Sequence, residues 1–371
     1  MRRRLGRVNP GSPAGAAAEL NRVRYRPIGN TGELISEIGF GTGDNAGLLV
    51  RGTPDDQCRA FERALELGIT YWDTSPDYGD HVGLAEVNIG KLMRQFQVRP
   101  FITTKVEVMP EHLGDVAGAV QRSIEGSLQR LRTDWVDVLQ IHNPPALETN
   151  TNVSGWIHLG LRDYLGPNGA LEGLERVRRQ GKARYLGFAC EHADPRAVRQ
   201  LLDTRAFSLI NVWYDLLNPT AAYGRVPGLH VGHDYDGIIG HARDLGVGVA
   251  TIRPLSGGAL TEHAIGGGAR HPLAGGGLSR RTDVYQEMVE QARPFAFLSQ
   301  PGQKLSEAAF RFALHTDGVT TVIGGFSELA HLEEAVGNSG APPLAPELMA
   351  RVQLVWRANY GREASHAWSS A

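Results

Sequence analysis

Short apolar runs alternate with helical segments along most of this chain of 371 residues. We expect strands at residues 38–41, 70–73, 101–104, 136–141, 183–188, 209–213, 247–252 and 320–323. We expect helices at residues 54–67, 83–93, 113–131, 171–180, 195–202, 235–245, 304–315 and 329–336. The strand runs are nearly continuous in apolar residues, which is typical of strands that are covered on both faces. Eight such strands, each followed by a helix, predict an α/β fold, a closed (β/α)8 TIM barrel.

Several segments lie outside this repeat. Residues 25–38 carry a turn signal, Asn30-Thr31-Gly32, between two β-prone runs, and they predict an N-terminal β-hairpin that plugs the bottom of the barrel. Residues 143–167 and 254–301 form long loops after the fourth and seventh strands, and residues 347–357 predict a helix in the tail. Long loops at the carboxyl ends of barrel strands usually carry function, so we expect them to wall a substrate pocket. We expect one domain at 21–371 and a disordered extension at 1–20.

Charge and cysteine content narrow the range of partners. The chain has 38 Lys and Arg against 40 Asp and Glu, a net charge of −2, so its overall field favours neither nucleic acid nor an anionic membrane. We therefore expect a small-molecule ligand. No apolar stretch approaches the roughly 18–20 residues that span a bilayer. Two cysteines, Cys58 and Cys190, cannot form a disulfide framework and fit a reducing cytoplasm. The sequence does not indicate an oligomeric state.

Four polar residues of different chemistry follow three successive predicted strands. Asp73 and Tyr78 lie in GITYWDTSPDYG (68–79), Lys105 ends FITTK, and His142 follows VDVLQI. The carboxyl ends of barrel strands meet on one face, so we expect the four side chains to form an active site there.

The residue types in this set suit proton transfer to a carbonyl oxygen. A free phenol has a pKa of about 10, and a lysine about 4 Å away at an effective dielectric of about 20 lowers that pKa by roughly three units at most. Lys105 would thus make Tyr78 a usable acid, and Asp73 would keep the lysine charged. His142 would hold the substrate oxygen against the phenol. Together they fit reduction of a carbonyl, in which hydride reaches carbon and a proton reaches oxygen.

None of these side chains supplies hydride, so the chemistry requires a nicotinamide cofactor. The usual dinucleotide fingerprint is absent. The run GFGTGDNAG (39–47) lacks the third glycine of the Rossmann spacing, and we expect no helix directly behind it. His230 and His233 suggest a metal site, but a third ligand at a recognisable spacing is missing and the chemistry needs no metal.

The sequence resembles the aldo-keto reductase family. The resemblance rests on GITYWDTSPDYG, AEVNIGK (85–91), FITTKV, DVLQIHNP and GKARYLGF (181–188), which occur in the family order. It implies a catalytic tetrad of Asp73, Tyr78, Lys105 and His142, with Tyr78 as proton donor, and an extended NAD(P) cofactor across the barrel mouth. The cofactor contacts that it implies are Gly41, Thr42, Cys190, Asn211, Trp213, Arg253, Leu255, Gly257, Gly325, Phe326, Ser327, His331 and Glu334.

This chain departs from the family pattern at several of these positions. Cys190 stands where an asparagine usually holds the carboxamide, so Cys190 or a neighbour must compensate, and Asn211 replaces a glutamine. Arg253 is a candidate pyrophosphate contact. Gly325 and His331 replace the basic residues that often bind the 2′-phosphate, and Glu328 offers an acceptor for a ribose 2′-hydroxyl. We expect a slight preference for NADP(H), with NAD(H) also possible.

The tetrad does not encode a reaction direction. We expect an oxidoreductase that acts on an aldehyde or ketone, or on the corresponding alcohol. Oxidation of a sugar, as in relatives that resemble aldose 1-dehydrogenases, is an alternative. A cofactor-binding regulatory subunit with little turnover is an alternative of another class, and a metal-dependent barrel hydrolase is a third.

Overall fold

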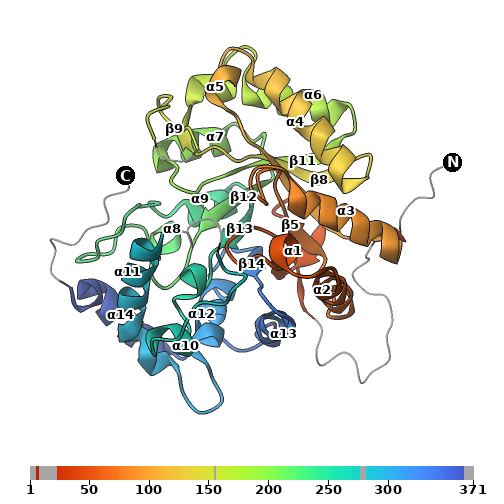
Figure 1. Ribbon diagram of the computed structural model, residues 1–371. Helices are drawn as coiled ribbons and strands as arrows, with labels where there is room; N and C mark the ends of the chain where they lie inside the picture. Colours follow the sequence, from red (N-terminus) through yellow and green to blue (C-terminus); the bar gives the residue numbers. More distant parts are fainter. Residues whose placement is uncertain (1–5, 8–22, 154–155, 276–280, 363–371) are drawn as a thin grey trace.

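The computed structural model describes residues 6–7, 23–153, 156–275 and 281–362 (Figure 1). Eight parallel strands form a closed barrel in the order β4, β5, β7, β8, β11, β12, β13 and β14, and β14 pairs again with β4. Their bounds are β4 (Ile38–Gly41), β5 (Tyr71–Asp73), β7 (Phe101–Val106), β8 (Val136–Ile141), β11 (Ala183–Ala189), β12 (Leu209–Trp213), β13 (Gly248–Ile252) and β14 (Thr321–Gly325). The predicted barrel fold is confirmed.

Each barrel strand is followed by a helix that packs outside the sheet, as Figure 1 shows. These helices are α2 (Pro54–Glu66), α3 (Leu84–Phe96), α4 (Val116–Leu131), α6 (Ala170–Arg179), α7 (Pro195–Asp203), α9 (Ile238–Asp244), α12 (Leu305–Leu314) and α13 (Leu329–Gly337). The first of them illustrates why they begin where they do. Pro54 occupies the first turn of α2, and the hydroxyl of Thr53 accepts a hydrogen bond of 3.2 Å from the Asp56 N–H. This cap satisfies one of the free N–H groups at the helix start.

Further short strands and helices are present in addition to the eight barrel strands and their helices. The strands among them are β1 (Gly6–Arg7), β2 (Tyr25–Pro27), β3 (Leu34–Ser36), β6 (Val98–Arg99), β9 (Pro145–Ala146) and β10 (Leu159–Gly160). The helices are α1 (Leu48–Arg51), α5 (Leu161–Leu165), α8 (Thr220–Tyr223), α10 (Glu262–Ile265), α11 (Thr282–Ala292) and α14 (Pro346–Arg357). The 3-10 turns are η2 (Pro110–His112), η3 (Ser256–Gly258), η5 (Arg293–Leu298) and η6 (Asn359–Gly361).

The N-terminal hairpin closes the amino end of the barrel. Strands β2 and β3 pair antiparallel, and Ile28 and Ile35 between and within them are fully buried. They pack with Tyr71, Phe101 and Val138, which lie near the starts of three barrel strands. The hairpin therefore acts as the predicted plug. Ahead of it, β1 pairs parallel with β6, and the rest of the predicted disordered extension lies outside the described residues.

One local expectation was wrong. We expected no helix directly behind residues 39–47, yet α1 begins at Leu48. Gly47 adopts a left-handed conformation with φ of 80°, and Leu48, Leu49 and Val50 are buried behind it. Three consecutive apolar residues carry no helical period, so only their burial against the barrel stabilises this single turn.

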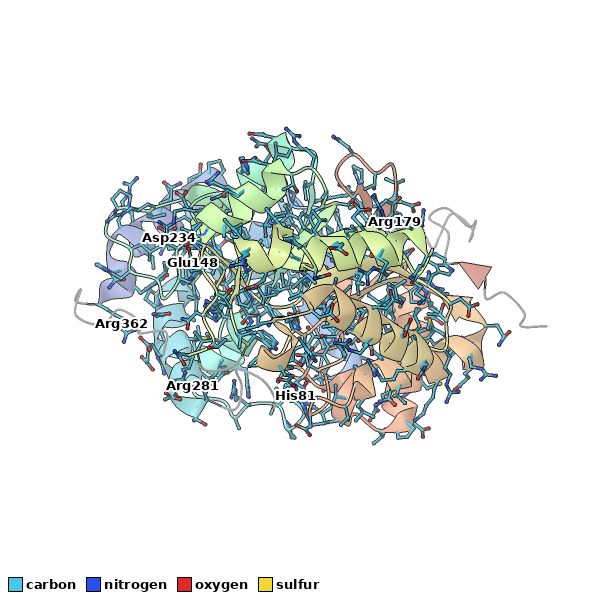
Figure 2. The ribbon with its side chains drawn as sticks, turned by 90° about the horizontal axis from the view of Figure 1, so that it is seen from above. His81, Glu148, Arg179, Asp234, Arg281 and Arg362 are labelled. Carbon is cyan, nitrogen blue, oxygen red and sulfur yellow. The ribbon has the colours of Figure 1, made fainter. Side chains whose placement is uncertain are left out.

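Figure 2 shows charged side chains on the surface, among them Arg179 at the end of α6. Within the described part of the chain, no helix has the length and apolar composition to cross a membrane.

Two glycines in the middle of helices test the packing of the outer layer. A Cβ on Gly90 of α3 would lie 2.4 Å from the carbonyl oxygen of Arg130 in α4, whereas a Cβ on Gly240 of α9 would meet nothing within 4 Å. Gly90→Ala should lower the free energy of unfolding by about 1–3 kcal/mol through overpacking. Gly240→Ala should raise it by about 0.5–1 kcal/mol, because alanine loses less backbone entropy in a helix. Chemical denaturation measures both, and equal effects would contradict the close contact between α3 and α4.

Candidate active site

The ammonium group of Lys105 makes three hydrogen bonds at the carboxyl end of β7. Its Nζ atom lies 2.6 Å from Asp73 Oδ1, 2.8 Å from the Thr74 carbonyl oxygen and 3.4 Å from Tyr78 Oη. Lys105 and Asp73 are 2% and 3% exposed. A buried charge without a partner would cost several kcal/mol, so this ion pair holds both side chains in one place.

Asn211 extends this network across the barrel mouth. Its amide nitrogen donates to Asp73 Oδ2 over 2.9 Å, and its amide oxygen accepts from Gln140 over 2.9 Å. Both oxygens of the Asp73 carboxylate therefore have a donor. Asn211 is buried in β12, and its amide is already engaged on both sides.

Tyr78 stands on the loop above β5 with its hydroxyl directed at Lys105. Burial raises the pKa of Tyr78 well above its usual value, and the negative charges of Asp73, Asp77 and Glu191 raise that pKa further. We expected Lys105 to lower the pKa of Tyr78, and this expectation was wrong. The lysine has little effect because its charge is compensated by Asp73, and the phenol is the most distant of its three partners. The phenol is thus held protonated in the free protein.

His142 follows β8 and lies beside Tyr78, with ring centroids 6.1 Å apart and ring planes at 77°. Its Nδ1 atom is 3.2 Å from Asp77 Oδ1 and 3.2 Å from Ser75 Oγ. Trp156, from the loop after β8, covers the imidazole at 4.0 Å between ring centroids. The structure therefore brings all four tetrad residues together. Asp77 was missed by the sequence analysis, although it directly precedes Tyr78.

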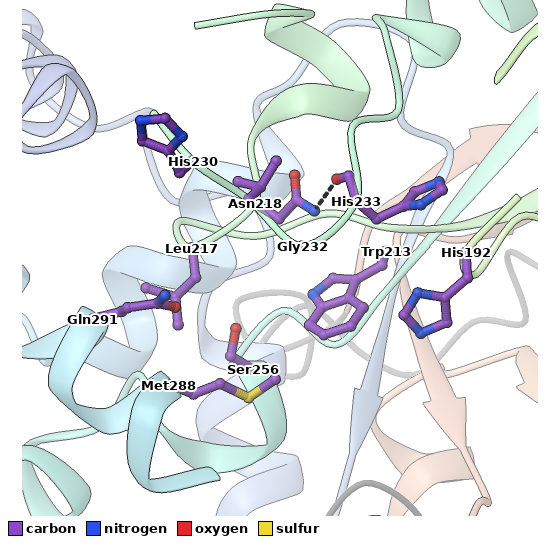
Figure 3. Close-up of a pocket in the computed structure, with 11 residues that line it drawn as sticks. His192, Trp213, Leu217, Asn218, His230, Gly232, His233, Ser256, Met288 and Gln291 are labelled. Atoms are coloured by element: carbon purple, nitrogen blue, oxygen red, sulfur yellow. Dashed lines mark hydrogen bonds between the residues drawn. The ribbon is translucent and has the colours of Figure 1, made fainter. Parts of the chain in front are cut away.

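A pocket opens near the carboxyl end of β12, with an empty space of about 500 Å³ that includes the part open to solvent (Figure 3). Trp213 and His192 form one side and Ser256 and Met288 face them, as Figure 3 shows. The indole N–H of Trp213 donates to the buried carboxylate of Asp215 over 2.7 Å, which fixes the ring. The pocket is lined by His192, Trp213, Leu217, Asn218, His230, Val231, Gly232, His233, Ser256, Met288 and Gln291.

The walls of this pocket only partly match the expectation. The loop after β13 contributes Ser256, Met288 and Gln291, as expected for residues 254–301. The loop between β12 and α9 contributes most of the rest, although we did not expect it to line the pocket. Its length of more than twenty residues was the available signal, because long loops in compact domains are usually functional. The amide of Asn218 donates to the His233 carbonyl over 2.9 Å and ties this loop together.

A second cavity adjoins the first and shares Ser256 and Met288 with it, and its empty space of about 260 Å³ also includes the part open to solvent. Arg253 and Arg270 bring two guanidinium groups to it. Gly257 has a left-handed φ of 67° and open space where a Cβ would be. The amide oxygen of Asn45 is buried there without a hydrogen bond in the described part of the chain. Two cations beside an open glycine backbone suit a diphosphate, so the residues fit the expected dinucleotide.

The other predicted cofactor residues lie at the ends of neighbouring barrel strands. Gly41 ends β4 and Thr42 follows it, and the hydroxyl of Thr42 donates to the Asp73 carbonyl over 2.9 Å. Arg253 lies 4.5 Å over the Trp213 ring and pairs with Glu191 over 2.5 Å. The remaining positions are Leu255 and Gly257 after β13, Gly325, Phe326 and Ser327 at the end of β14, and His331 and Glu334 in α13.

Three of these cofactor contacts stay predictions, because the structure engages their side chains within the protein. The thiol of Cys190 is fully buried in the core, and burial raises its pKa. The Phe326 ring is 2% exposed and packs edge-on against Phe40, which leaves only its backbone for a ligand. Glu334 is held by Lys304, over 2.5 Å, and by Ser306 of α12. In each case the side chain at a predicted cofactor-binding position already contacts other residues of the protein.

Comparison with known proteins shows which family this chain belongs to. The model of the aldo/keto reductase family matches residues 37–357. The chain belongs to this family. An L-galactose dehydrogenase of Arabidopsis thaliana is 26% identical over 324 residues, 85% of this chain and 88% of the relative. An L-glyceraldehyde 3-phosphate reductase of Escherichia coli is 24% identical over 333 residues, 85% and 87% of the two chains. Membership places this chain among the NAD(P)H-dependent oxidoreductases.

A solved aldo-keto reductase of Bacillus halodurans, in its holo form, has the same fold. Its TM-score is 0.65 at 21% identity, over 91% of this chain and 97% of the other. Within the residues that the structure describes, no group of three or more His, Cys, Asp or Glu side chains could hold a metal ion.

The buried ion pair of this family member can be tested without a substrate. Lys105→Met leaves the Asp73 carboxylate buried without its cation, which should lower the free energy of unfolding by about 3–5 kcal/mol. Lys182→Met removes a partly exposed lysine that pairs with Glu125 at the surface, and stability should hardly change. Thermal unfolding of both variants measures the difference. A small effect of Lys105→Met would mean that the pair is open to water.

Proposed function

We propose that this aldo-keto reductase transfers hydride between a nicotinamide and an aldehyde or ketone, or the corresponding alcohol, with Tyr78 as general acid and base. The observation that carries the proposal is the contact of Tyr78 Oη with the buried Lys105–Asp73 pair. When bound, NAD(P) supplies or accepts the hydride. The chain itself moves the proton.

Three residues have separate roles in the proposed proton transfer. Tyr78 is protonated in the free protein and can deliver that proton to a developing alkoxide. His142 lies beside it and can hydrogen-bond the same substrate oxygen. Lys105 stabilises the phenolate that remains, because its Nζ is already within 3.4 Å of Oη. In the oxidation of an alcohol the same groups act in reverse.

Tyr78→Phe tests this assignment, since it removes only the hydroxyl. We expect kcat to fall by roughly 10²- to 10⁴-fold, the usual contribution of a general acid. Cofactor binding and thermal stability should stay close to wild type. Tyr223→Phe is the control, because Tyr223 is 45% exposed on α8. Activity of Tyr78→Phe within a few-fold of wild type would rule out the phenol as proton donor.

The lining of the 500 Å³ pocket favours a sugar as a second candidate substrate. It combines the Trp213 ring with the neutral polar groups of Asn218, Ser256 and Gln291, and no Asp, Glu, Lys or Arg is among its lining residues. Burial lowers the pKa of His233 to about 4, so this imidazole is neutral at pH 7. Aromatic rings and neutral hydrogen-bonding groups suit a polyhydroxylated substrate better than a phosphorylated one. The similarity to an L-galactose dehydrogenase agrees with this candidate.

Steady-state assays in both directions separate these possibilities. Turnover of free sugars with oxidised cofactor would support the sugar dehydrogenase, and turnover of simple aldehydes with reduced cofactor would support the general reductase. Binding of NAD(P)H without any turnover would instead favour a regulatory subunit. We also propose a cytoplasmic location, because Cys58 and Cys190 are both free thiols.

The cofactor preference depends on the charges at the start of α13. The resemblance slightly favours NADP(H), but the exposed carboxylate of Glu328 lies 3.5 Å from His331 and 3.8 Å from His271. We propose that Glu328 lowers the preference for a 2′-phosphate, so that both cofactors are usable.

Glu328→Gln tests this proposal. Removal of one negative charge should raise the ratio of kcat/KM for NADPH over NADH by roughly fivefold, the effect of about 1 kcal/mol between charges 4 Å apart in water. Glu333→Gln is the matched control, because its carboxylate pairs with Arg63 of α2. A ratio that responds equally in both variants would mean that Glu328 does not face the cofactor.

A further inference from the structure

The carboxylate of Asp215 is fully buried behind the pocket beside Trp213, and the proposed proton transfer does not use it. Its Oδ2 atom accepts hydrogen bonds from Trp213 Nε1 over 2.7 Å and from Ser256 Oγ over 2.5 Å. Its Oδ1 atom accepts from the backbone N–H groups of Leu217, over 2.8 Å, and Asn218, over 2.9 Å. One buried carboxylate therefore holds four donors.

All four donors belong to residues that line the pocket, and Figure 3 labels each of them. Trp213 ends β12, and Leu217 and Asn218 lie in the loop that follows it. Ser256 comes from the loop after β13. Asp215 itself is not among the lining residues. It thus joins two walls of the pocket from behind.

The indole of Trp213 has two fixed contacts. Its N–H only donates, so its orientation depends on the acceptor that Asp215 provides. The guanidinium of Arg253 lies 4.5 Å from the centroid of the ring. Arg253 is also among the charges that act on the pKa of Tyr78, so this side of the pocket lies within electrostatic reach of the phenol.

A purely local role for Asp215 would be to stabilise the turn after β12. The two bonds to Oδ1 come from residues two and three positions further along the chain, and asparagine forms this kind of turn as well as aspartate. The bonds to Oδ2 differ, because Ser256 lies 41 positions away. Only a carboxylate has an acceptor on both of its terminal atoms. The charge at this position therefore serves Trp213 and Ser256 rather than the turn.

We propose that Asp215 is a positioning residue for substrate specificity, whose Oδ2 atom holds the Trp213 ring and the Ser256 hydroxyl in the places that shape the pocket. The proposal rests on the proposed function, because it takes this pocket as the place for the part of a substrate beyond its carbonyl group. Walls that are already in place lower the cost of binding a substrate that fills the pocket. A small aldehyde that does not reach the walls gains nothing from them.

The carboxylate of Asp215 is mostly ionised at neutral pH and loses its charge in mild acid. Burial raises its pKa to about 6, and the hydrogen bonds from its four donors oppose this rise. The nearby phenols of Tyr214 and Tyr360 have pKa values well above the usual one, so they stay neutral, and Arg253 is a charged neighbour across the Trp213 ring. A proton on the carboxylate removes one acceptor site, which loosens the set of four hydrogen bonds.

Asp215→Asn keeps the size of the side chain and the turn, and it replaces the Oδ2 acceptor by an amide NH₂ group. KM should rise roughly tenfold, the factor that one net hydrogen bond represents, for the largest substrate that the wild type turns over from a panel of aldoses and aromatic aldehydes. KM for propanal and both kcat values should change less than about threefold, because the tetrad is untouched. If the ratio of the two KM values stays as in wild type, the proposal fails.

Trp213→Phe tests whether the effect passes through the indole. Phenylalanine keeps an aromatic ring but has no N–H to donate to Asp215. Asp215→Asn should therefore raise the KM ratio less in the Trp213→Phe background than in the wild-type background. Fully additive effects of the two substitutions would show that the carboxylate does not act through the ring, against the proposal.

Asp137→Asn is the matched control for the loss of a buried carboxylate. Asp137 is fully buried near the amino end of β8, at the opposite end of the barrel from the pocket, and pairs with Arg99 over 2.8 Å. This substitution should lower the melting temperature and leave the KM ratio unchanged. If Asp215→Asn also changes only the melting temperature, Asp215 is structural and the proposal is wrong.

A measurement without turnover separates this proposal from the proposed function. Protein labelled with 15N-tryptophan shows each indole N–H by NMR, and the Trp213→Phe variant assigns the signal of Trp213. We expect this signal to shift as the carboxylate gains a proton at a pH of about 6, and to show no such shift in Asp215→Asn. A Trp213 signal that does not respond to pH in wild type would overturn the role of Asp215 even if the enzyme is active. The expected spectrum with no turnover of any substrate would instead count against the proposed function alone.

Discussion

The buried ion pair between Lys105 and Asp73 is the interaction on which the rest of the site depends. It joins two neighbouring strands at the carboxyl end of the barrel, and its two charges are almost completely removed from water. Such a pair is stable only if every remaining hydrogen-bonding group is satisfied. Thr74, Tyr78 and Asn211 provide those partners, so the phenol and the opposite wall of the barrel are both tied to the same two charges.

Burial, together with the charges around this pair, explains why Tyr78 keeps its proton. Three carboxylates surround the phenol, and the single lysine beside it is already compensated by one of them. Under the proposed function, this is the proton that the hydroxyl would deliver to the substrate oxygen. The charged side chains at the barrel mouth are also unevenly placed. No Asp, Glu, Lys or Arg lines the pocket beside Trp213, whereas Arg253 and Arg270 line the cavity next to it.

Much of this arrangement could be read from individual residues. Asp73, Lys105 and His142 each end an apolar run, and the ends of parallel strands converge whatever the loops do, so their meeting was predictable. Other predicted contacts were less certain from the sequence. Cys190 and Phe326 occupy motif positions, but their side chains are buried in the core, and Glu334 pairs with Lys304. A motif position specifies the backbone location, whereas the rotamer and the partners come from packing.

The sequence by itself determined the eight-fold barrel, the strand ends that carry the four polar side chains, and the class of chemistry they can perform. Local periodicity and strand order are properties of the chain, so they need no tertiary information. Only the tertiary structure decided that Asp77 faces His142, that the long loop after β12 walls the pocket, and that the pKa of Tyr78 rises. Each of these depends on the distance between groups far apart in the sequence or on their removal from water, and both quantities exist only once the chain has folded.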